Sequence, residues 1–217
     1  MKSTFIALGA SVALFFCAKG HAALADDIAL LQQSWAKVNY ELKDDAQEKA
    51  FKALIKDSQK VVTSYPDDAE SHIWHGIIQS SYAGAKGGLG ALGLAKQAKV
   101  EFEQAIAIDR EALSGSALTS LGTLYSQVPG WPIGFGDDSK ARELFEQSLA
   151  INPYGLDINY FYAQFLYDER EYSTALLHLQ RAQAAPKRPG RENADLYRQA
   201  EVTELLALVE KKLKRKK

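Results

Sequence analysis

Cysteine, methionine and histidine are rare in this 217-residue chain, which has one Cys, one Met and four His. A single cysteine cannot form an intrachain disulfide, so the fold depends on its apolar core. The sequence contains neither G-x-S-x-G nor H-E-x-x-H, the local patterns of many serine hydrolases and zinc peptidases. Its 26 basic and 27 acidic residues nearly balance, which argues against a general affinity for nucleic acid. We therefore expect a protein without catalytic activity, cofactor or metal.

The one long apolar run lies at the N-terminus and has the pattern of an export signal. Lys2 precedes the run FIALGASVALFFCA, and Lys19 ends it before the roughly 20 apolar residues of a membrane-spanning helix are reached. Small residues that a signal peptidase accepts precede two alternative cleavage points, after Ala22 and after Ala25. We expect residues 1–22 to be a secretory signal peptide.

The remaining residues, 23–217, are expected to form a single mature domain that is secreted into the periplasm. Loss of Lys2 and Lys19 from the 26 basic residues leaves 24 against 27 acidic ones, a net charge of −3. Cys17 is a poor lipid-anchor cysteine because Phe16 precedes it, where such anchors need a small residue. We therefore expect no lipid anchor and no membrane-spanning segment in the mature chain.

The mature sequence has helical periodicity and no alternating strand pattern. In DDIALLQQSWAKVNYE, for example, Ile28, Leu31, Trp35 and Val38 recur at helical spacing. The pattern predicts an all-α fold of about nine helices, with a helical hairpin first and a long amphipathic helix from Glu192 as the C-terminal cap. The expected early helices are residues 26–41, 44–65, 69–82 and 95–109.

Small and aromatic residues then recur in the order that defines a tetratricopeptide repeat. The clearest copy reads Leu121-Gly122-x-x-Tyr125, then Ala141-x-x-x-Phe145. Similar positions 22 residues apart, as from Ala141 to Ala163, identify neighbouring copies in the same register. The expected repeats are residues 68–111, 115–153 and 156–186.

Two of these repeats carry extra residues between their helices. The first copy has ten, in the glycine-rich stretch AGAKGGLGALG, which predicts a loop over residues 83–93. The second has seven, in VPGWPIGFGDD, with Asp137 or Asp138 capping the helix that follows. Both inserts should emerge on one edge of the stack. The G-x-G-x-x-G within the first stretch is not a dinucleotide motif, because helices rather than a strand and a helix flank it.

The second repeat also resembles a particular family. The segment SLGTLYSQVPGWPIGFGDDSKARELFEQSLAINP is similar to the central repeat of the periplasmic T-component family of TRAP (tripartite ATP-independent periplasmic) transporters. This resemblance implies an exported helical-repeat protein that works beside a solute-binding protein and handles apolar ligands. The broader resemblance to tetratricopeptide proteins implies a concave groove that binds a partner.

The repeat register predicts which residues line that groove. The predicted contacts are Thr119, Thr123, Tyr160, Gln164 and Tyr167. The predicted surface carries hydroxyls, amides and tyrosines but lacks the several Lys or Arg that would bind an acidic partner terminus. It suits a peptide backbone or a modest apolar ligand.

The VPGWPIGFGDD loop offers a second surface through Trp131, Ile133 and Phe135. The sequence leaves two alternatives: the trio is exposed and binds a partner, or the loop folds back over an apolar seam. His72 and His75, three residues apart, lack a third ligand for a metal. We expect one of them to lie against a neighbouring helix and the other to face solvent.

Two hypotheses of function follow. The first is a non-catalytic scaffold that binds a protein partner through the groove and the 128–138 loop. The alternative is a ligand-handling accessory component of a TRAP-type solute transporter. The basic C-terminal sequence KKLKRKK is expected to be a solvated helix end, where cations interact favourably with the helix dipole.

Overall fold

The structure is a computed structural model that describes the backbone of residues 11–215 and, from residue 22 onward, all of their side chains but that of Leu89. Within this range it consists of nine α-helices and one π-helical turn, with no strand, which confirms the predicted all-α class. The elements are α1 (Ser11–Ala36), η1 (Lys37–Glu41), α2 (Asp44–Ser64), α3 (Ala69–Lys86), α4 (Gly88–Ile108), α5 (Ala112–Gln127), α6 (Asp138–Ile151), α7 (Leu156–Asp168), α8 (Tyr172–Gln183) and α9 (Glu192–Lys214).

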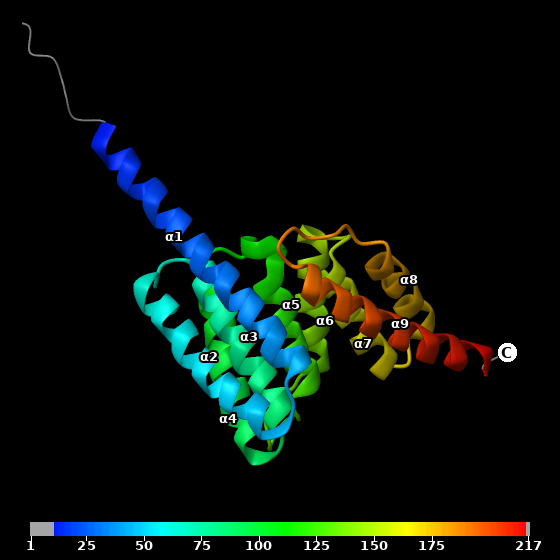
Figure 1. Cartoon of the computed structure of the whole chain (residues 1–217). Coiled ribbons are helices and arrows are strands. Elements are labelled where there is room, and N and C mark those ends of the chain that lie inside the picture. The colour runs from blue at the N-terminus through cyan, green and yellow to red at the C-terminus, as the bar shows by residue number, and fades with distance from the viewer. Residues whose placement is uncertain (1–10, 216–217) are drawn as a thin grey trace, which may run out of the picture.

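The N-terminal residues fall partly outside this range. Residues 1–10 of the predicted signal peptide lie outside the described residues, and from Ser11 the backbone is helical. Figure 1 shows the first half of α1 projecting beyond the other helices. Among the described helices, none combines the length and the apolar character needed to cross a membrane.

Helices that follow one another along the chain pack against each other. The closest pairs are α3 with α4, α5 with α6, and α7 with α8, and α3, α5 and α7 also contact one another in succession. Figure 1 shows α2 to α4 on one side of the molecule and α6 to α9 on the other. The small residues of the repeat pattern lie where the paired helices meet.

The α3–α4 pair and the α5–α6 pair pack in the same way. Ala98 and Ala141 are fully buried, as are the phenyl rings of Phe102 and Phe145. A Cβ placed on Gly76 would lie 2.6 Å from Phe102 Cε1, and one on Gly122 would lie 3.2 Å from Phe145 Cδ1. A ring from the second helix of each pair therefore fills the space that a glycine leaves on the first.

The glycine-rich stretch is helical, and the predicted loop over residues 83–93 is wrong. Helix α3 continues to Lys86 and α4 begins at Gly88, so only Gly87 separates them. Gly87 has φ +61°, a left-handed conformation that favours glycine and reverses the chain in one step. The ten extra residues lengthen two helices, because Ala, Leu and Lys are good helix formers and the stretch contains no proline.

The second insert is a true loop, as predicted. Residues 128–137 link α5 to α6, and Asp137 caps α6 by accepting a hydrogen bond from the Lys140 backbone N–H at 3.0 Å. Gly136 is required here, because an added Cβ would lie 1.8 Å from the Val128 carbonyl oxygen. The two inserts do lie side by side, because Leu92 of α4 packs beside Gly134.

The C-terminal helix contacts both the last helical pair and the π-helical turn η1 near the start of the chain. The central and C-terminal parts of α9 pack on α7 and α8 through Val202, Leu205 and Val209. Its N-terminal part reaches back to η1, where Tyr197 stacks on Tyr40 with ring centroids 4.5 Å apart. Asn193 also donates a hydrogen bond to Glu41 at 3.0 Å. Helix α9 therefore spans from the last helical pair to the first, and does more than cap one end.

Candidate functional site

A cavity of about 1030 Å³ lies between the two sides of the molecule. Its walls come from η1 and the end of α1, from α3, α4, α5 and α7, from the 128–137 loop, and from the segment that leads into α9. Arg198 and Glu201 of α9 also form part of this wall.

Four of the five predicted groove residues line this cavity. Thr119 and Thr123 lie on α5, and Tyr160 and Gln164 lie on α7, each pair one helical turn apart. Tyr167 is not among the lining residues. Its ring lies 5.5 Å from that of Tyr172 and beneath Lys212, in the contact of α7 with α8 and α9.

The three predicted loop contacts separate into different environments. Trp131 is 90% exposed and does not line the cavity, whereas Ile133 is 68% exposed and forms part of the cavity wall. Phe135 is half-buried and packs edge-on against Tyr125, with ring centroids 5.6 Å apart. Trp131 and Ile133 are therefore exposed, whereas Phe135 folds back onto α5. Hydrogen bonds such as that from the Gly136 N–H to the Pro129 carbonyl, at 3.0 Å, shape the loop.

Three hydroxyls of the cavity wall donate to carbonyl groups within the helices that carry them. Ser80 donates to the carbonyl of Ile77 at 3.0 Å, and Thr123 donates to that of Thr119 at 2.9 Å. Ser116 likewise donates to the Leu113 carbonyl at 2.8 Å. Because these groups are satisfied locally, a ligand does not need to supply partners for them.

Arginines reach the cavity from the C-terminal segment, contrary to the sequence prediction that its lining lacks Lys and Arg. Arg188, Arg191 and Arg198 all line it. They come from residues 184–191 and from α9, outside the repeats from which the groove was predicted. The prediction is wrong because the register describes helices within the stack and carries no information about a segment that folds back across it.

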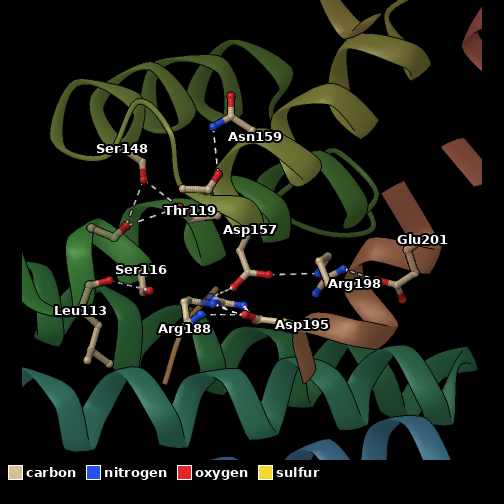
Figure 2. A network of polar contacts seen from close by, with 12 residues as sticks. Leu113, Ser116, Thr119, Ser148, Asp157, Asn159, Arg188, Asp195, Arg198 and Glu201 are labelled. Atoms are coloured by element: carbon tan, nitrogen blue, oxygen red, sulfur yellow. Dashed lines mark hydrogen bonds and ion pairs between the residues drawn. The ribbon is translucent and has the colours of Figure 1, made fainter. Parts of the chain in front are cut away.

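Two of these arginines form a network with acidic residues (Figure 2). Asp157 lies between them: its Oδ2 accepts from Arg188 Nη1 at 2.6 Å and its Oδ1 accepts from Arg198 Nε at 3.0 Å. Arg188 also contacts Asp195 Oδ1 at 2.5 Å, and Arg198 contacts Glu201 Oε2 at 2.5 Å. Figure 2 shows that the network ties the N-terminal end of α7 to α9.

The pKa values of Asp157 and Arg198 favour the charged form of their contact, whereas burial raises the pKa of Glu201. Burial alone raises the pKa of Asp157, but the positive charges of Arg198 and Arg188 outweigh burial and lower that pKa to about 2. Burial tends to lower the pKa of Arg198, yet the charge of Asp157 leaves it raised. Asp157 is therefore a paired anion at neutral pH and is poorly suited to act as a general base.

Arg191, the third arginine of the cavity wall, is not part of this network. It forms no salt bridge with any described residue, and its buried Nε has no hydrogen-bond partner. Its guanidinium lies over the Trp74 ring, with Cζ 5.0 Å from the ring centroid. Burial and the neighbouring Arg188 charge both lower the pKa of Arg191.

The two histidines considered as metal ligands have other partners. The prediction that one of them faces solvent is wrong, because both are buried. His72 Nδ1 lies 2.6 Å from Glu101 Oε2, and His72 Nε2 lies 2.9 Å from the Pro66 carbonyl oxygen. His75 Nδ1 contacts Ser58 Oγ at 2.7 Å. The described residues contain no group of three or more His, Cys, Asp or Glu that could hold a metal ion.

No family model and no curated protein matches this chain. The resemblance to the tetratricopeptide superfamily and to the T-component family of TRAP transporters therefore stays a prediction.

Proposed function

We propose that this protein is an exported, non-catalytic binding protein whose ligand occupies the central cavity. The observation that carries the proposal is the size and position of that cavity. Its volume of about 1030 Å³ is at the upper end of ordinary small-molecule sites, roughly 300–1000 Å³, and it lies among packed helices. In this proposal the helices form a tetratricopeptide-type stack, and the protein acts as a periplasmic ligand-handling accessory of a TRAP-type solute transporter.

The chemistry of the lining supports binding rather than catalysis. Its two carboxylates are both paired: Asp157 is held by two arginines and Glu201 by Arg198. His72, His75 and His178 are buried away from the cavity wall. The cavity therefore lacks the pairing of a nucleophile with a nearby base that group transfer or hydrolysis would need.

Native mass spectrometry of the full chain purified from producing cells tests this function. We expect a bound small molecule, and we expect Ser120→Phe to displace it because Ser120 lines the cavity. Ser173→Phe is the matched control, since Ser173 is exposed on α8. If the molecule still binds to the Ser120→Phe variant, its site lies outside this cavity. If the protein neither retains nor takes up any small molecule, the proposal is contradicted.

A second candidate function, binding of a protein partner, is favoured by the exposed end of the 128–138 loop. Trp131 and Ile133 expose large apolar side chains on a hydrogen-bonded loop, and such side chains form contacts at low entropic cost. Crosslinking in cells should capture a partner that Trp131→Ser loses and Tyr154→Ser retains. Tyr154 is the control because it is also a large exposed aromatic residue. Equal capture by both variants would exclude the loop as the contact.

A further inference from the structure

We infer that the cavity takes an organic monoanion: a ligand with one carboxylate held by Arg191 and Trp74, and an apolar body that extends along α3 and α5. This inference rests on the proposed function of the cavity as a ligand site, and it adds the chemical class of the ligand. Three features of the cavity support it: a cation without a direct ion pair, a buried donor without an acceptor, and a mainly apolar far end.

Arg191 is a cation without a direct ion pair among the described residues. The two carboxylates whose charges act on Arg191, those of Asp157 and Asp195, already accept hydrogen bonds from Arg188. The network around them contains the charges of Arg188 and Arg198 against three carboxylates, and Arg191 is the third cation that balances these charges without touching any of them. A half-buried guanidinium that makes no ion pair loses hydration without gaining a partner, so an anion that enters the cavity gains a contact that the protein does not satisfy itself.

Trp74 is the donor without an acceptor. Its side chain is 2% exposed and lines the cavity, and its Nε1 has no hydrogen-bond partner. Arg191 Nε is also buried without a partner, and the guanidinium lies over the Trp74 ring. Both unpartnered atoms are N–H groups that can only donate. A carboxylate, which only accepts, satisfies them, whereas an ammonium group would add a donor and a like charge.

The opposite end of the cavity is mainly apolar, with Gln127 as a polar residue between Leu124 and Val128. Ala83 at the end of α3 and Leu124 at the end of α5 belong to one buried cluster, while Trp74 and Leu113, near the starts of these helices, belong to another. The cavity therefore extends along both helices from the Arg191 end. At its far end the wall includes Ala91, Leu92, Ala95, Leu124, Val128 and Ile133. A second charge on the ligand would lie against these residues, which is why we infer one anionic group.

Titration calorimetry of the full chain at pH 7.5 with three ligands that share one body tests the inference. The ligands are 4-phenylbutyrate, 4-phenylbutan-1-ol and 4-phenylbutylamine. A charge-assisted hydrogen bond in a desolvated site corresponds to about a tenfold to hundredfold gain in affinity, so 4-phenylbutyrate should bind more tightly than either analogue by roughly that factor.

Variants then assign the preference to the named groups. Arg191→Gln should abolish the preference for the anion, and Arg191→Lys should keep part of it. Trp74→Phe should weaken binding of the acid severalfold, with little effect on the alcohol. Arg110→Gln, at an exposed site outside the cavity, is the matched control and should behave as wild type. Thermal melts establish that each variant is folded, and Trp74→Phe tests the same end of the cavity independently of Arg191.

The outcomes separate this inference from the proposed function. Equal binding of the acid, the alcohol and the amine, or a preference for the acid that survives Arg191→Gln, overturns the inference and leaves the cavity as a ligand site. Absence of binding by all three also overturns the inference. The proposed function falls with it only if native mass spectrometry of the purified protein finds no bound molecule.

Discussion

Alanine substitution of three helical glycines tests the packing of the helical pairs. Alanine gains about 1 kcal/mol over glycine in a helix interior. At Gly93 a new Cβ would meet nothing within 4 Å, so the full gain should appear. At Gly122 the nearest atoms are 3.2 Å away, which offsets part of that gain.

Gly76 should behave in the opposite way. A Cβ there would lie 2.6 and 2.9 Å from two atoms of the fully buried Phe102 ring, so the ring or a helix must shift. Overpacking of this kind costs about 1–3 kcal/mol. After the helix-propensity gain of about 1 kcal/mol is subtracted from that cost, we expect Gly76→Ala to lower the free energy of unfolding by up to about 2 kcal/mol, with Gly122→Ala close to wild type and Gly93→Ala about 1 kcal/mol more stable.

Urea denaturation followed by circular dichroism measures the three free energies, and thermal melts should shift by roughly 2–4 °C per kcal/mol for a protein of this size. The order Gly93→Ala above Gly122→Ala above Gly76→Ala is the decisive result. If Gly76→Ala were as stable as Gly93→Ala, the close approach of Phe102 to α3 would be refuted, and with it the packing of α3 on α4.

Three further predictions concern other contacts. Burial lowers the pKa of His178 to about 4, below the unfolded value near 6.5, so protons bind preferentially to the unfolded chain; stability should fall as pH drops from about 6.5 to about 4, and His178→Asn should flatten this dependence in urea titrations. Ser148 is fully buried, contacts Thr119 Oγ1 at 2.7 Å and donates to a backbone carbonyl; Ser148→Ala should lower the unfolding free energy by about 1–3 kcal/mol, and an unchanged value would refute the contact. Trp131→Ala should leave the unfolding free energy unchanged because the side chain is exposed. Phe135→Ala should lower it by about 1–2 kcal/mol because the ring packs against Tyr125. Equal effects of the two variants would contradict the exposed position of Trp131 and the packed position of Phe135.

Much of the helical packing could be predicted because it depends on residues close together in the chain. The spacing of Gly122, Ala141 and Phe145 identified two helices in contact, and these residues do meet. Helical spacing also placed Thr119 and Thr123 on one face of α5, and both line the cavity. Periodicity of this kind is local information, because 3.6 residues per turn decide which side chains share a face.

The predicted loop over residues 83–93 failed for a different reason. Glycine content alone favoured a loop, but the stretch also contains Ala, Leu and Lys, and Gly87 provides a reversal of one residue. Where local preferences are balanced, tertiary contacts select the outcome: Ala95 and Ala98 of α4 are buried against neighbouring helices, which favours a continuous helix.

The local order of residues, then, was sufficient for the all-helical class, for the close-contact positions and for the face of α5 and α7 that lines the cavity. The cavity itself and its charges depended on contacts between distant segments. Arg191 lies over Trp74, 117 positions earlier in the chain, and Tyr197 stacks on Tyr40. No periodic pattern encodes such contacts, because they arise when α9 folds back on η1, and that fold is determined by the shape of the assembled helices.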